Sequence, residues 1–262
     1  MSAALLHARP LDPGGPVRTA RPLLALHGVR GHGGRWGFLT GRTGYAVDLR
    51  GHGRSVHRPP WTLDQHAADV AATAARLAPD GFDLVGLSFG GAVALQVAAR
   101  LPHLVHRQVL LDPAVAVDPA RARELARAAL DAPVFADPAE ARAVRARTWP
   151  QAPDRVVDEE VRTHLAASAD GRWRWRYHPG AVAAAFTEAA RPLPDPLPAV
   201  PTLVVAAARG SLLTAATLRA VRAHGYRVAE VDAGHGMDIE APGVVDGLVA
   251  QFLERPTGRP TP

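Results

Sequence analysis

Two residue types that often carry protein chemistry are missing from this chain of 262 residues. Cysteine does not occur, which excludes disulfide bonds, thiolate metal sites and a cysteine nucleophile. Lysine does not occur either, because all 30 basic residues are arginine, and a phosphate-binding loop that needs a lysine is therefore excluded. No apolar run approaches the ~18 residues that a membrane-spanning helix requires. We therefore predict no membrane span and no membrane partner.

The positively charged residues do not cluster in any one part of the sequence. The formal net charge is +5 and the pI is about 10.7, values that can accompany nucleic-acid binding. The arginines are spread along the chain and occur with abundant alanine and proline, as a bias toward GC-rich codons produces. We therefore predict no nucleic-acid partner. The first residues have no basic segment ahead of their short apolar patch, so we expect no signal peptide and a cytoplasmic location. The oligomeric state stays open.

Short apolar runs alternate with helical patterns in the first and last parts of the chain. The runs cover residues 22–27, 45–49, 82–87, 109–111, 202–206 and 226–231. Helical patterns cover residues 62–78, 90–101, 214–224 and 242–253. Nearly continuous apolar strands separated by helices are typical of a parallel sheet covered on both faces. The sequence therefore predicts an α/β fold.

The alternation stops between residues 113 and 198. Helix starts with Asp-Pro or an acidic first turn occur there at Asp118, Asp137 and Asp158, and a fourth helix is expected over residues 180–190. We predict that residues 113–198 form a helical cap inserted into a core of residues 1–112 and 199–254. The first 21 residues suit an antiparallel edge hairpin, and residues 255–262 are expected to be a disordered tail.

A serine flanked by glycines stands between a predicted strand and a predicted helix, in the segment Gly86-Leu87-Ser88-Phe89-Gly90. This spacing in this context is typical of a nucleophile elbow, where a strained backbone lifts the serine hydroxyl clear of the sheet. The flanking glycines are needed because side chains would collide in so tight a turn. We predict that Ser88 is a catalytic nucleophile.

A serine hydroxyl needs a base that takes its proton. His235 is the best candidate, because it lies in a loop of small residues directly after the last predicted strand, at the carboxyl edge of the sheet where α/β sites form. Gly28 follows the first core strand and lets the chain bend. The backbone N–H groups of Val29 and Phe89 can then hold an oxyanion together.

Two other interpretations of these residues are weaker. A phosphate-binding loop needs Gly-x-Gly-x-x-Gly, and the glycines near Ser88 do not have that spacing. A metal site would draw on His27, His32, His52, His57 and Asp48. These residues have no recognised ligand spacing, so we predict no metal and no cofactor.

Four motifs, taken in order, resemble the α/β-hydrolase superfamily. They are Leu26-His27-Gly28, the segment Asp-Leu-Arg-Gly-His-Gly-Arg-Ser at residues 48–55, the serine motif at residues 86–91, and Gly234-His235. The resemblance extends from about residue 20 to residue 254. It implies an eight-stranded, mostly parallel sheet with a helical cap inserted between strands six and seven. It also implies that residues 48–55 shape a loop and take no part in catalysis.

The resemblance implies a triad of serine, histidine and an acid, and the chain departs from the family at the acid. The usual position follows strand seven, where residues 204–213 contain no Asp or Glu. The family's other position is the end of strand six, and Asp112 stands there. Because an acid orients the imidazole and stabilises its cation, we predict that Asp112 completes the triad. A serine–histidine dyad, or an acid from the histidine loop (Asp232 or Asp238), is the alternative.

Aromatic residues alternate with arginine in the predicted cap, at Trp173 and Trp175. This pattern favours an extended segment that packs on the cap. A second interpretation is that these rings, with Trp149 and Trp36, line a substrate pocket above Ser88.

These residues predict a serine hydrolase, carboxylesterase-like, that cleaves a small-molecule carboxylic ester through an acyl-enzyme on Ser88. The serine argues against epoxide hydrolases and haloalkane dehalogenases, which resemble this fold but use aspartate at that position. Lactonase, thioesterase, perhydrolase and C–C bond hydrolase stay compatible, because the fold does not choose among them. The alternative from a different class is a catalytically degenerate ligand-binding protein of the same fold. It is supported by the absence of an acid after strand seven.

Overall fold

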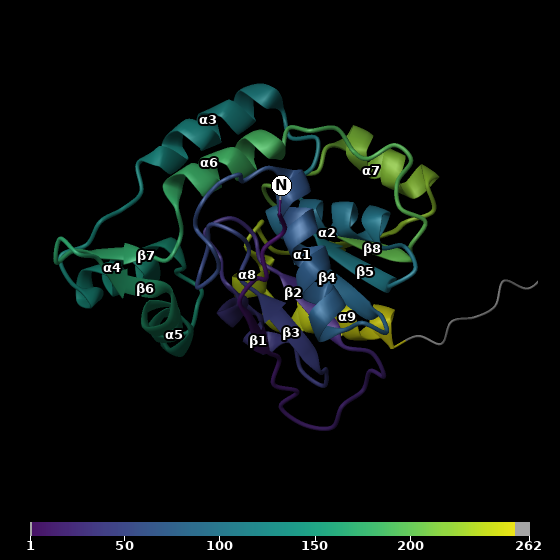
Figure 1. Cartoon of the computed structure of the whole chain (residues 1–262), viewed down its shortest axis with the longest axis horizontal. Coiled ribbons are helices and arrows are strands. Elements are labelled where there is room, and N and C mark those ends of the chain that lie inside the picture. Colours follow the sequence, from purple (N-terminus) through teal and green to yellow (C-terminus); the bar gives the residue numbers. More distant parts are fainter. Residues whose placement is uncertain (1, 255–262) are drawn as a thin grey trace, which may run out of the picture.

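A seven-stranded sheet forms the centre of residues 2–254, the part of the chain that the computed structural model describes (Figure 1). The strands are β1 (Ala8–Pro10), β2 (Leu23–Leu26), β3 (Gly44–Val47), β4 (Phe82–Leu87), β5 (Val105–Leu111), β8 (Thr202–Ala207) and β9 (Arg227–Val231). They lie in the order β1-β3-β2-β4-β5-β8-β9. Every neighbouring pair is parallel except β1 with β3. The predicted α/β class with a mostly parallel sheet is confirmed.

The number of strands is a correction. We predicted eight, and the described residues contribute seven to this sheet. The difference lies in the first 21 residues, where β1 alone joins the sheet and no hairpin forms. Pro10, Pro13 and Pro16 explain this, because proline has no N–H to donate to a strand partner. In chain order the insert therefore lies between the fifth and sixth strands of the sheet, β5 and β8, and not between the sixth and seventh.

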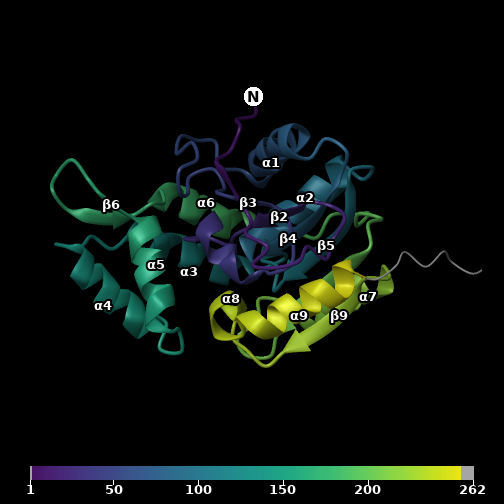
Figure 2. The same ribbon diagram turned by 90° about the horizontal axis from the view of Figure 1, so that it is seen from below.

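Helices cover both faces of the sheet, and Figure 2 shows α1 and α9 on opposite sides. The helices of this layer structure are α1 (Leu63–Leu77), α2 (Phe89–Arg100), α7 (Ala215–Ala223), α8 (Met237–Glu240) and α9 (Pro242–Leu253), with a 3₁₀ helix, η1 (Gly33–Phe38). Thr62 begins α1 by accepting a hydrogen bond from the Gln65 N–H, as a capping residue does. Because the strands from β2 to β9 in this sheet are parallel, the loops that follow them lie at the same edge of the sheet.

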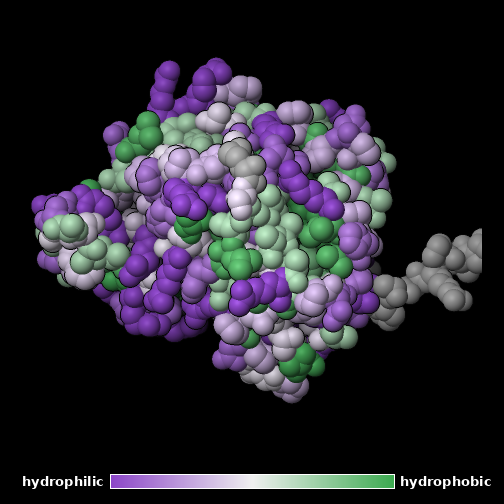
Figure 3. Space-filling model, viewed as in Figure 1, coloured by the Kyte–Doolittle hydropathy of each residue, from purple (hydrophilic) through white to green (hydrophobic). Residues whose placement is uncertain are grey.

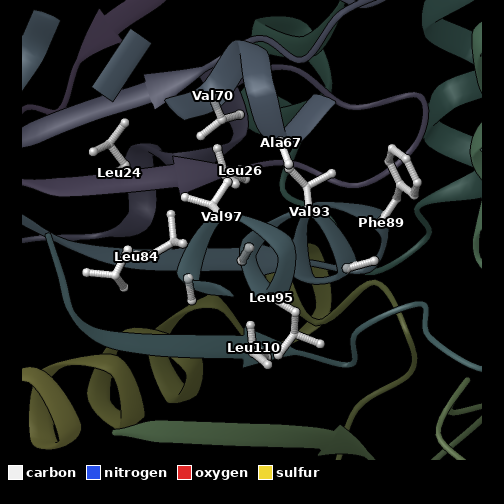
Figure 4. Close-up of a cluster of buried hydrophobic side chains, with 14 of the residues drawn as sticks. Leu24, Leu26, Ala67, Val70, Leu84, Phe89, Val93, Leu95, Val97 and Leu110 are labelled. Atoms are coloured by element: carbon white, nitrogen blue, oxygen red, sulfur yellow. The ribbon is translucent and has the colours of Figure 1, made fainter. Parts of the chain in front are cut away.

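The core divides into two layers because successive side chains of a strand point to opposite faces. In β2, Leu24 and Leu26 pack toward α1 and α2, whereas Leu23 and Ala25 pack toward η1 and α9. Figure 4 shows the first layer, in which Val93 of α2 lies among these leucines and side chains of α1. The sheet is thereby sealed on both sides, and only its edges can hold a site.

The segment between β5 and β8 contains four helices and a small hairpin. They are α3 (Pro119–Leu130), α4 (Pro138–Thr148), α5 (Asp154–His164), the antiparallel strands β6 (Leu165–Ala167) and β7 (Trp173–Trp175), and α6 (Pro179–Glu188). Asp118 and Asp137 cap α3 and α4 as the sequence predicts. The hairpin is a correction to an all-helical insert, because the alternating segment at Trp173 pairs as a strand. Helices α3 and α6 lie side by side above the sheet edge (Figure 1).

Hydrophilic and apolar residues are interspersed over the face of the molecule in Figure 3. Several arginines on the surface pair with acids nearby, for example Arg142 with Asp158 and Arg174 with Asp170. Among residues 2–254, no helix is both long and apolar enough to cross a membrane. The predicted tail at 255–262 lies outside the described residues.

Acid should destabilise the fold through His66 of α1. This side chain is 0% exposed, packs its edge on Phe89, and has no hydrogen-bond partner for either ring nitrogen within the described chain. Burial lowers the pKa of His66 from 6.5 to about 3. Between these two pH values His66 is protonated in the unfolded chain and neutral in the folded chain. The free energy of unfolding therefore decreases as the pH falls from 6.5 toward 3. At about pH 5 the loss is about 2 kcal/mol, or roughly 4–8 °C in Tm.

His66→Leu removes this proton uptake. We expect its Tm to fall less than that of the wild type between about pH 7.5 and about pH 5, by roughly those 4–8 °C, as measured by thermal unfolding. Substitution of the exposed His103 by Gln is the matched control and should leave the acid response unchanged. Equal acid losses in His66→Leu and wild type would refute the role of His66.

Candidate active site

Ser88 occupies a strained turn between β4 and α2. Its backbone angles are φ 54° and ψ −120°, a region that residues with a side chain adopt rarely and at a cost of about 1–3 kcal/mol. Hydrogen bonds hold the turn on both sides. The Ser88 N–H donates to the Leu111 carbonyl at 2.9 Å, and the Ser88 carbonyl accepts from the N–H groups of Gly91 and Ala114, each at 2.9 Å.

Glycine is required on both sides of Ser88 because backbone atoms approach closely. A Cβ on Gly86 would collide with the carbonyl of Gly90, and a Cβ on Gly90 would collide with the carbonyl of Leu26. The second contact packs α2 directly on the end of β2. The glycines of the motif thus allow the turn, as the sequence predicts.

The structure brings Ser88, His235 and Asp112 together from three separate elements. His235 Nε2 lies 2.9 Å from Ser88 Oγ, and His235 Nδ1 lies 2.6 Å from Asp112 Oδ2. One neutral tautomer satisfies both bonds: Nδ1–H donates to the carboxylate, and Nε2 accepts from the serine hydroxyl. The arrangement can take a proton from Ser88 and stabilise the resulting imidazolium.

Asp112 is held as a carboxylate at the end of β5, where it is 0% exposed. Burial alone would raise its pKa, but hydrogen bonds from His235 and Ser211 bring the pKa of Asp112 below its ordinary value. Ser211 Oγ donates to Asp112 Oδ1, and the N–H of Leu212 donates to Oδ2 at 3.1 Å. Sequence reasoning missed Ser211 as a support. Its position after β8, where the family usually has the acid, was the available signal.

The two alternative acids of the histidine loop lie elsewhere. Asp232 is exposed and pairs with Arg209 at the surface. Asp238 is buried, and its Oδ2 has no hydrogen-bond partner within residues 2–254. Neither carboxylate is hydrogen-bonded to His235, whereas Asp112 is.

The predicted oxyanion donors, Val29 and Phe89, belong to segments that meet at Ser88. Gly28 approaches Ser88 so closely that a Cβ on it would lie 3.0 Å from Ser88 Cβ, and Val29 follows directly. Phe89 is the first residue of α2, where helix N–H groups have no partner within the helix. Within the described chain, neither the Val29 N–H nor the Phe89 N–H has a hydrogen-bond partner. Both can donate to an oxygen that develops negative charge beside Ser88.

The histidines of the neighbouring loops serve as hydrogen-bond acceptors. His27 Nε2 accepts from the Leu49 N–H at 2.9 Å, and His52 Nε2 accepts from the Arg30 N–H at 3.2 Å. Burial lowers the pKa of His27 to about 4 and that of His52 to about 3, so both rings are neutral near pH 7. Within residues 2–254, no three His, Asp or Glu side chains are grouped so that they could hold a metal ion. These rings instead fix the loop that contains Val29.

The predicted aromatic pocket residues separate into different environments. Trp36 is 1% exposed and packs in the core beside Leu39, which contradicts our second interpretation, in which it lines a pocket. Trp149 lines a cavity of about 450 Å³ between the insert and the core. Trp175 is buried in the insert with Trp173 packed against the same cluster. Extended packing, the first of our two interpretations, therefore describes the segment at Trp173.

A buried ion-pair network, which no sequence motif predicted, joins the insert to the core. Glu160 of α5 is 2% exposed. It accepts hydrogen bonds from Arg35 Nη2 at 2.8 Å and from His32 Nε2 at 2.9 Å. Burial opposes its charge, but Arg35 and His32 keep the pKa of Glu160 well below its ordinary value. The partners are more than 120 residues apart in the sequence, which is why local spacing carried no signal of them.

The chain belongs to the alpha/beta hydrolase family, because the model of that family matches residues 23–247. It is 40% identical over 211 residues to lipase LipV of Mycobacterium tuberculosis, a match that covers 79% of each chain. It is also 36% identical over 100 residues to N-formylmaleamate deformylase of Pseudomonas putida, about 36% of this chain and 37% of that protein. The fold and these relatives together define a hydrolase of this family.

Solved structures share the fold at low sequence identity. E-2-(acetamidomethylene)succinate hydrolase superposes with a TM-score of 0.80 at 24% identity and covers 95% of this chain and all of the other. An esterase of M. tuberculosis has a TM-score of 0.73 at 22% identity and covers 97% of this chain and 94% of its own.

Adding a side chain at Gly90 should disrupt the turn that contains Ser88. Gly90→Ala sets a methyl group against the Leu26 carbonyl, and backbone atoms cannot retreat as a flexible side chain can. We expect a loss of about 3 kcal/mol or more, or roughly 6–12 °C in Tm, measured by thermal unfolding. Gly247→Ala in the exposed part of α9 is the control, because a Cβ there meets nothing. It should be neutral or add about 0.5–1 kcal/mol. A Gly90→Ala protein with the wild-type Tm would contradict the close approach.

Proposed function

We propose that this hydrolase cleaves a small-molecule carboxylic ester through an acyl-enzyme on Ser88. The observation that carries the proposal is the unbroken hydrogen-bonded chain from Ser88 Oγ through His235 to the buried Asp112. Such a chain makes a hydroxyl nucleophilic near neutral pH, because the base and its orienting acid are already aligned.

In the proposed reaction, His235 Nε2 takes the Ser88 proton as Oγ attacks the ester carbonyl. The carboxylate of Asp112 stabilises the imidazolium that forms, and the donors from Ser211 and Leu212 keep that carboxylate ionised. The oxygen of the tetrahedral intermediate receives hydrogen bonds from the N–H groups of Val29 and Phe89. His235 then donates its proton to the departing alkoxide, and the ester C–O bond breaks.

The second half of the reaction repeats these roles with water. His235 Nε2 takes a proton from a water molecule that attacks the acyl carbonyl. The same N–H groups hold the second oxyanion, and the acid is released as the proton returns to Ser88 Oγ. All of these steps use side chains and backbone groups of this chain.

The relatives support an ester substrate. Lipase LipV is a relative over most of the chain, and an esterase of M. tuberculosis shares the fold. Names such as thioesterase and deformylase also occur among the similar proteins, so the ester has to be tested directly. A fluorophosphonate probe should label wild-type protein at Ser88, and p-nitrophenyl esters of increasing acyl length should be hydrolysed. A folded protein that neither reacts with the probe nor hydrolyses the esters would favour a ligand-binding role.

Ser88→Ala should remove nearly all activity and leave the fold intact. The substitution deletes one hydroxyl, and we expect a drop in kcat of roughly 10³-fold or more. Hydrolysis of the best p-nitrophenyl ester measures it, and circular dichroism checks the fold. If folded Ser88→Ala keeps more than about a tenth of the activity, the nucleophile is another residue.

Asp112→Asn should keep the shape of the site and lose the charge that stabilises the imidazolium. We expect kcat to fall by about 10²- to 10⁴-fold, with Tm changed by only a few degrees, as measured by ester hydrolysis and thermal unfolding. Asp232→Asn is the matched control at an exposed acid, and it should stay within about threefold of wild type. A near-normal Asp112→Asn enzyme would mean that serine and histidine work as a dyad.

A further inference from the structure

Arginine side chains gather where the insert meets the loop after β2. Arg30 follows the oxyanion residue Val29, Arg35 lies in η1, and Arg145 comes from α4 of the insert. Arg35 pairs with Glu160, and Arg145 Nη2 lies 3.3 Å from the same carboxylate. One carboxylate therefore serves two guanidinium groups, and Arg30 forms no ion pair with any described residue.

The guanidinium of Arg145 lies over two aromatic rings. Its guanidinium carbon lies 4.5 Å from the ring centre of Trp149 and 4.2 Å from that of Trp175. Its Nε is buried and has no hydrogen-bond partner within residues 2–254. Stacking occupies the faces of a guanidinium and leaves its N–H edge for an acceptor in the same plane. Arg145 therefore presents an unused donor in a fixed orientation.

Arg30 presents a second unused donor. Its Nε is buried, and its guanidinium forms no hydrogen bond with any part of the described chain. Its backbone is fixed, because φ is 59° and its N–H donates to His52. A buried donor without a partner costs about 1–3 kcal/mol, and a ligand that accepts from it recovers that cost.

Both arginines lie near Tyr177 of the insert: burial raises the pKa of this phenol, and the charges of Arg30 and Arg145 oppose that rise. His52, the acceptor for the Arg30 N–H, has its ring centre 6.3 Å from that of Tyr177. Val29 packs against the insert cluster that contains Tyr177 and Trp175, and Arg145 lies over Trp175. Val29 and Trp175 thus belong to one apolar cluster, here called the apolar wall, and the guanidinium of Arg145 lies over Trp175.

The charges of this region do not balance. Glu160 is ionised because Arg35 and His32 outweigh the effect of burial on its pKa. Burial lowers the pKa of Arg145 to about 10, which leaves it charged near pH 7. Burial also raises the pKa of Asp238, which makes the charged form of this nearby carboxyl less favourable as a second negative charge. Arg30, Arg35 and Arg145 against Glu160 leave an excess of two positive charges.

We propose that the substrate of this hydrolase carries a carboxylate, which the guanidinium groups of Arg30 and Arg145 bind at the insert end of the site. The inference rests on the proposed ester hydrolysis at Ser88 and names its substrate class: an ester whose acyl chain lies along the apolar wall and ends in an acid. A planar carboxylate suits two guanidinium edges, since it accepts in the plane of each fork. Inorganic phosphate serves as the competing anion in the test.

Binding is tested first, without any turnover. Glutarate should raise the Tm of the wild type and of Ser88→Ala at constant ionic strength, because neither measurement needs the nucleophile. Arg30→Gln and Arg145→Met should each weaken this binding by about 10-fold or more, and Met keeps an apolar side chain between the two tryptophans. Arg142→Gln is the control, because it removes an exposed arginine of the same helix, α4, that pairs with Asp154 and Asp158. It should bind glutarate as the wild type does.

Turnover is tested with a matched pair of esters. The ratio of kcat/KM for p-nitrophenyl hydrogen glutarate to that for p-nitrophenyl pentanoate should exceed one in the wild type and in Arg142→Gln. It should fall by about 10-fold or more in Arg30→Gln and in Arg145→Met. Arg30→Gln provides the decisive test if Arg145→Met fails to fold, because the Arg30 guanidinium has no hydrogen bond within the described chain to lose.

The outcomes separate the two proposals. A glutarate shift that both arginine variants lose, in a protein that hydrolyses no ester, would overturn the ester function and leave the carboxylate site standing. Ester hydrolysis with no glutarate shift and no preference for the acidic ester would overturn the carboxylate site alone. A shift with phosphate but not with glutarate would also overturn it. If Arg142→Gln and Arg30→Gln weaken glutarate binding equally, the binding is a general effect of positive charge, and the carboxylate site is refuted.

Discussion

The hydrogen bond between Asp112 and His235 is the contact on which the arrangement of the site depends. Asp112 ends β5, and the insert begins directly after it. His235 follows β9 at the far edge of the sheet. The segment after β8, the strand between them, supplies the donors that hold the carboxylate, through Ser211 and the Leu212 N–H. A single buried carboxylate therefore aligns three strand ends, and the orientation of the histidine ring follows from it.

The acid can stand on either of two strands because of the geometry of a parallel sheet. Strands β5 and β8 are neighbours that end at the same edge, and their registered residues lie side by side. A carboxylate at the end of either strand reaches a ring delivered from the loop after β9. In this chain the carboxylate stands on β5, and β8 contributes the hydroxyl of Ser211 where the family usually has an acid. Through the hydrogen bond from Ser211 to Asp112, the ends of both β5 and β8 contribute to the candidate site.

Local patterns predicted the parts of the site that a short segment determines. Ser88 and its glycines were predictable because a strained turn admits few residues, and His235 because small neighbours mark a loop at the sheet edge. Asp112 followed from the family resemblance, because the usual position after strand seven has no acid and Asp112 stands at the family's other position. The parallel order of the strands followed from alternating apolar runs and helices, whereas the first 21 residues misled because their prolines leave room for only one short strand.

The features that the sequence did not predict depend on contacts across long separations. Glu160 meets Arg35 only because α5 of the insert docks on η1, and no spacing rule connects residues 125 positions apart. The position of Trp36 could not be predicted for the same reason. Whether it lies in the core or at a pocket depends on how η1 packs against the sheet. Burial then changes the chemistry of these groups. His27 and His52 become neutral acceptors, whereas Glu160 stays charged through its partners.

The ion-pair network also explains why the insert and the core act on one site. Removing either partner of the pair between Glu160 and Arg35 would leave the other charge unpaired in a largely buried place, which costs about 3–5 kcal/mol. The pair therefore holds α5 of the insert against η1 of the core. Trp175 of the insert lies in the cluster that Val29 packs against, so the proposed carboxylate site and the proposed oxyanion donor share one support. Under these two proposals, a change in α5 can alter which substrate is accepted without changing Ser88, His235 or Asp112.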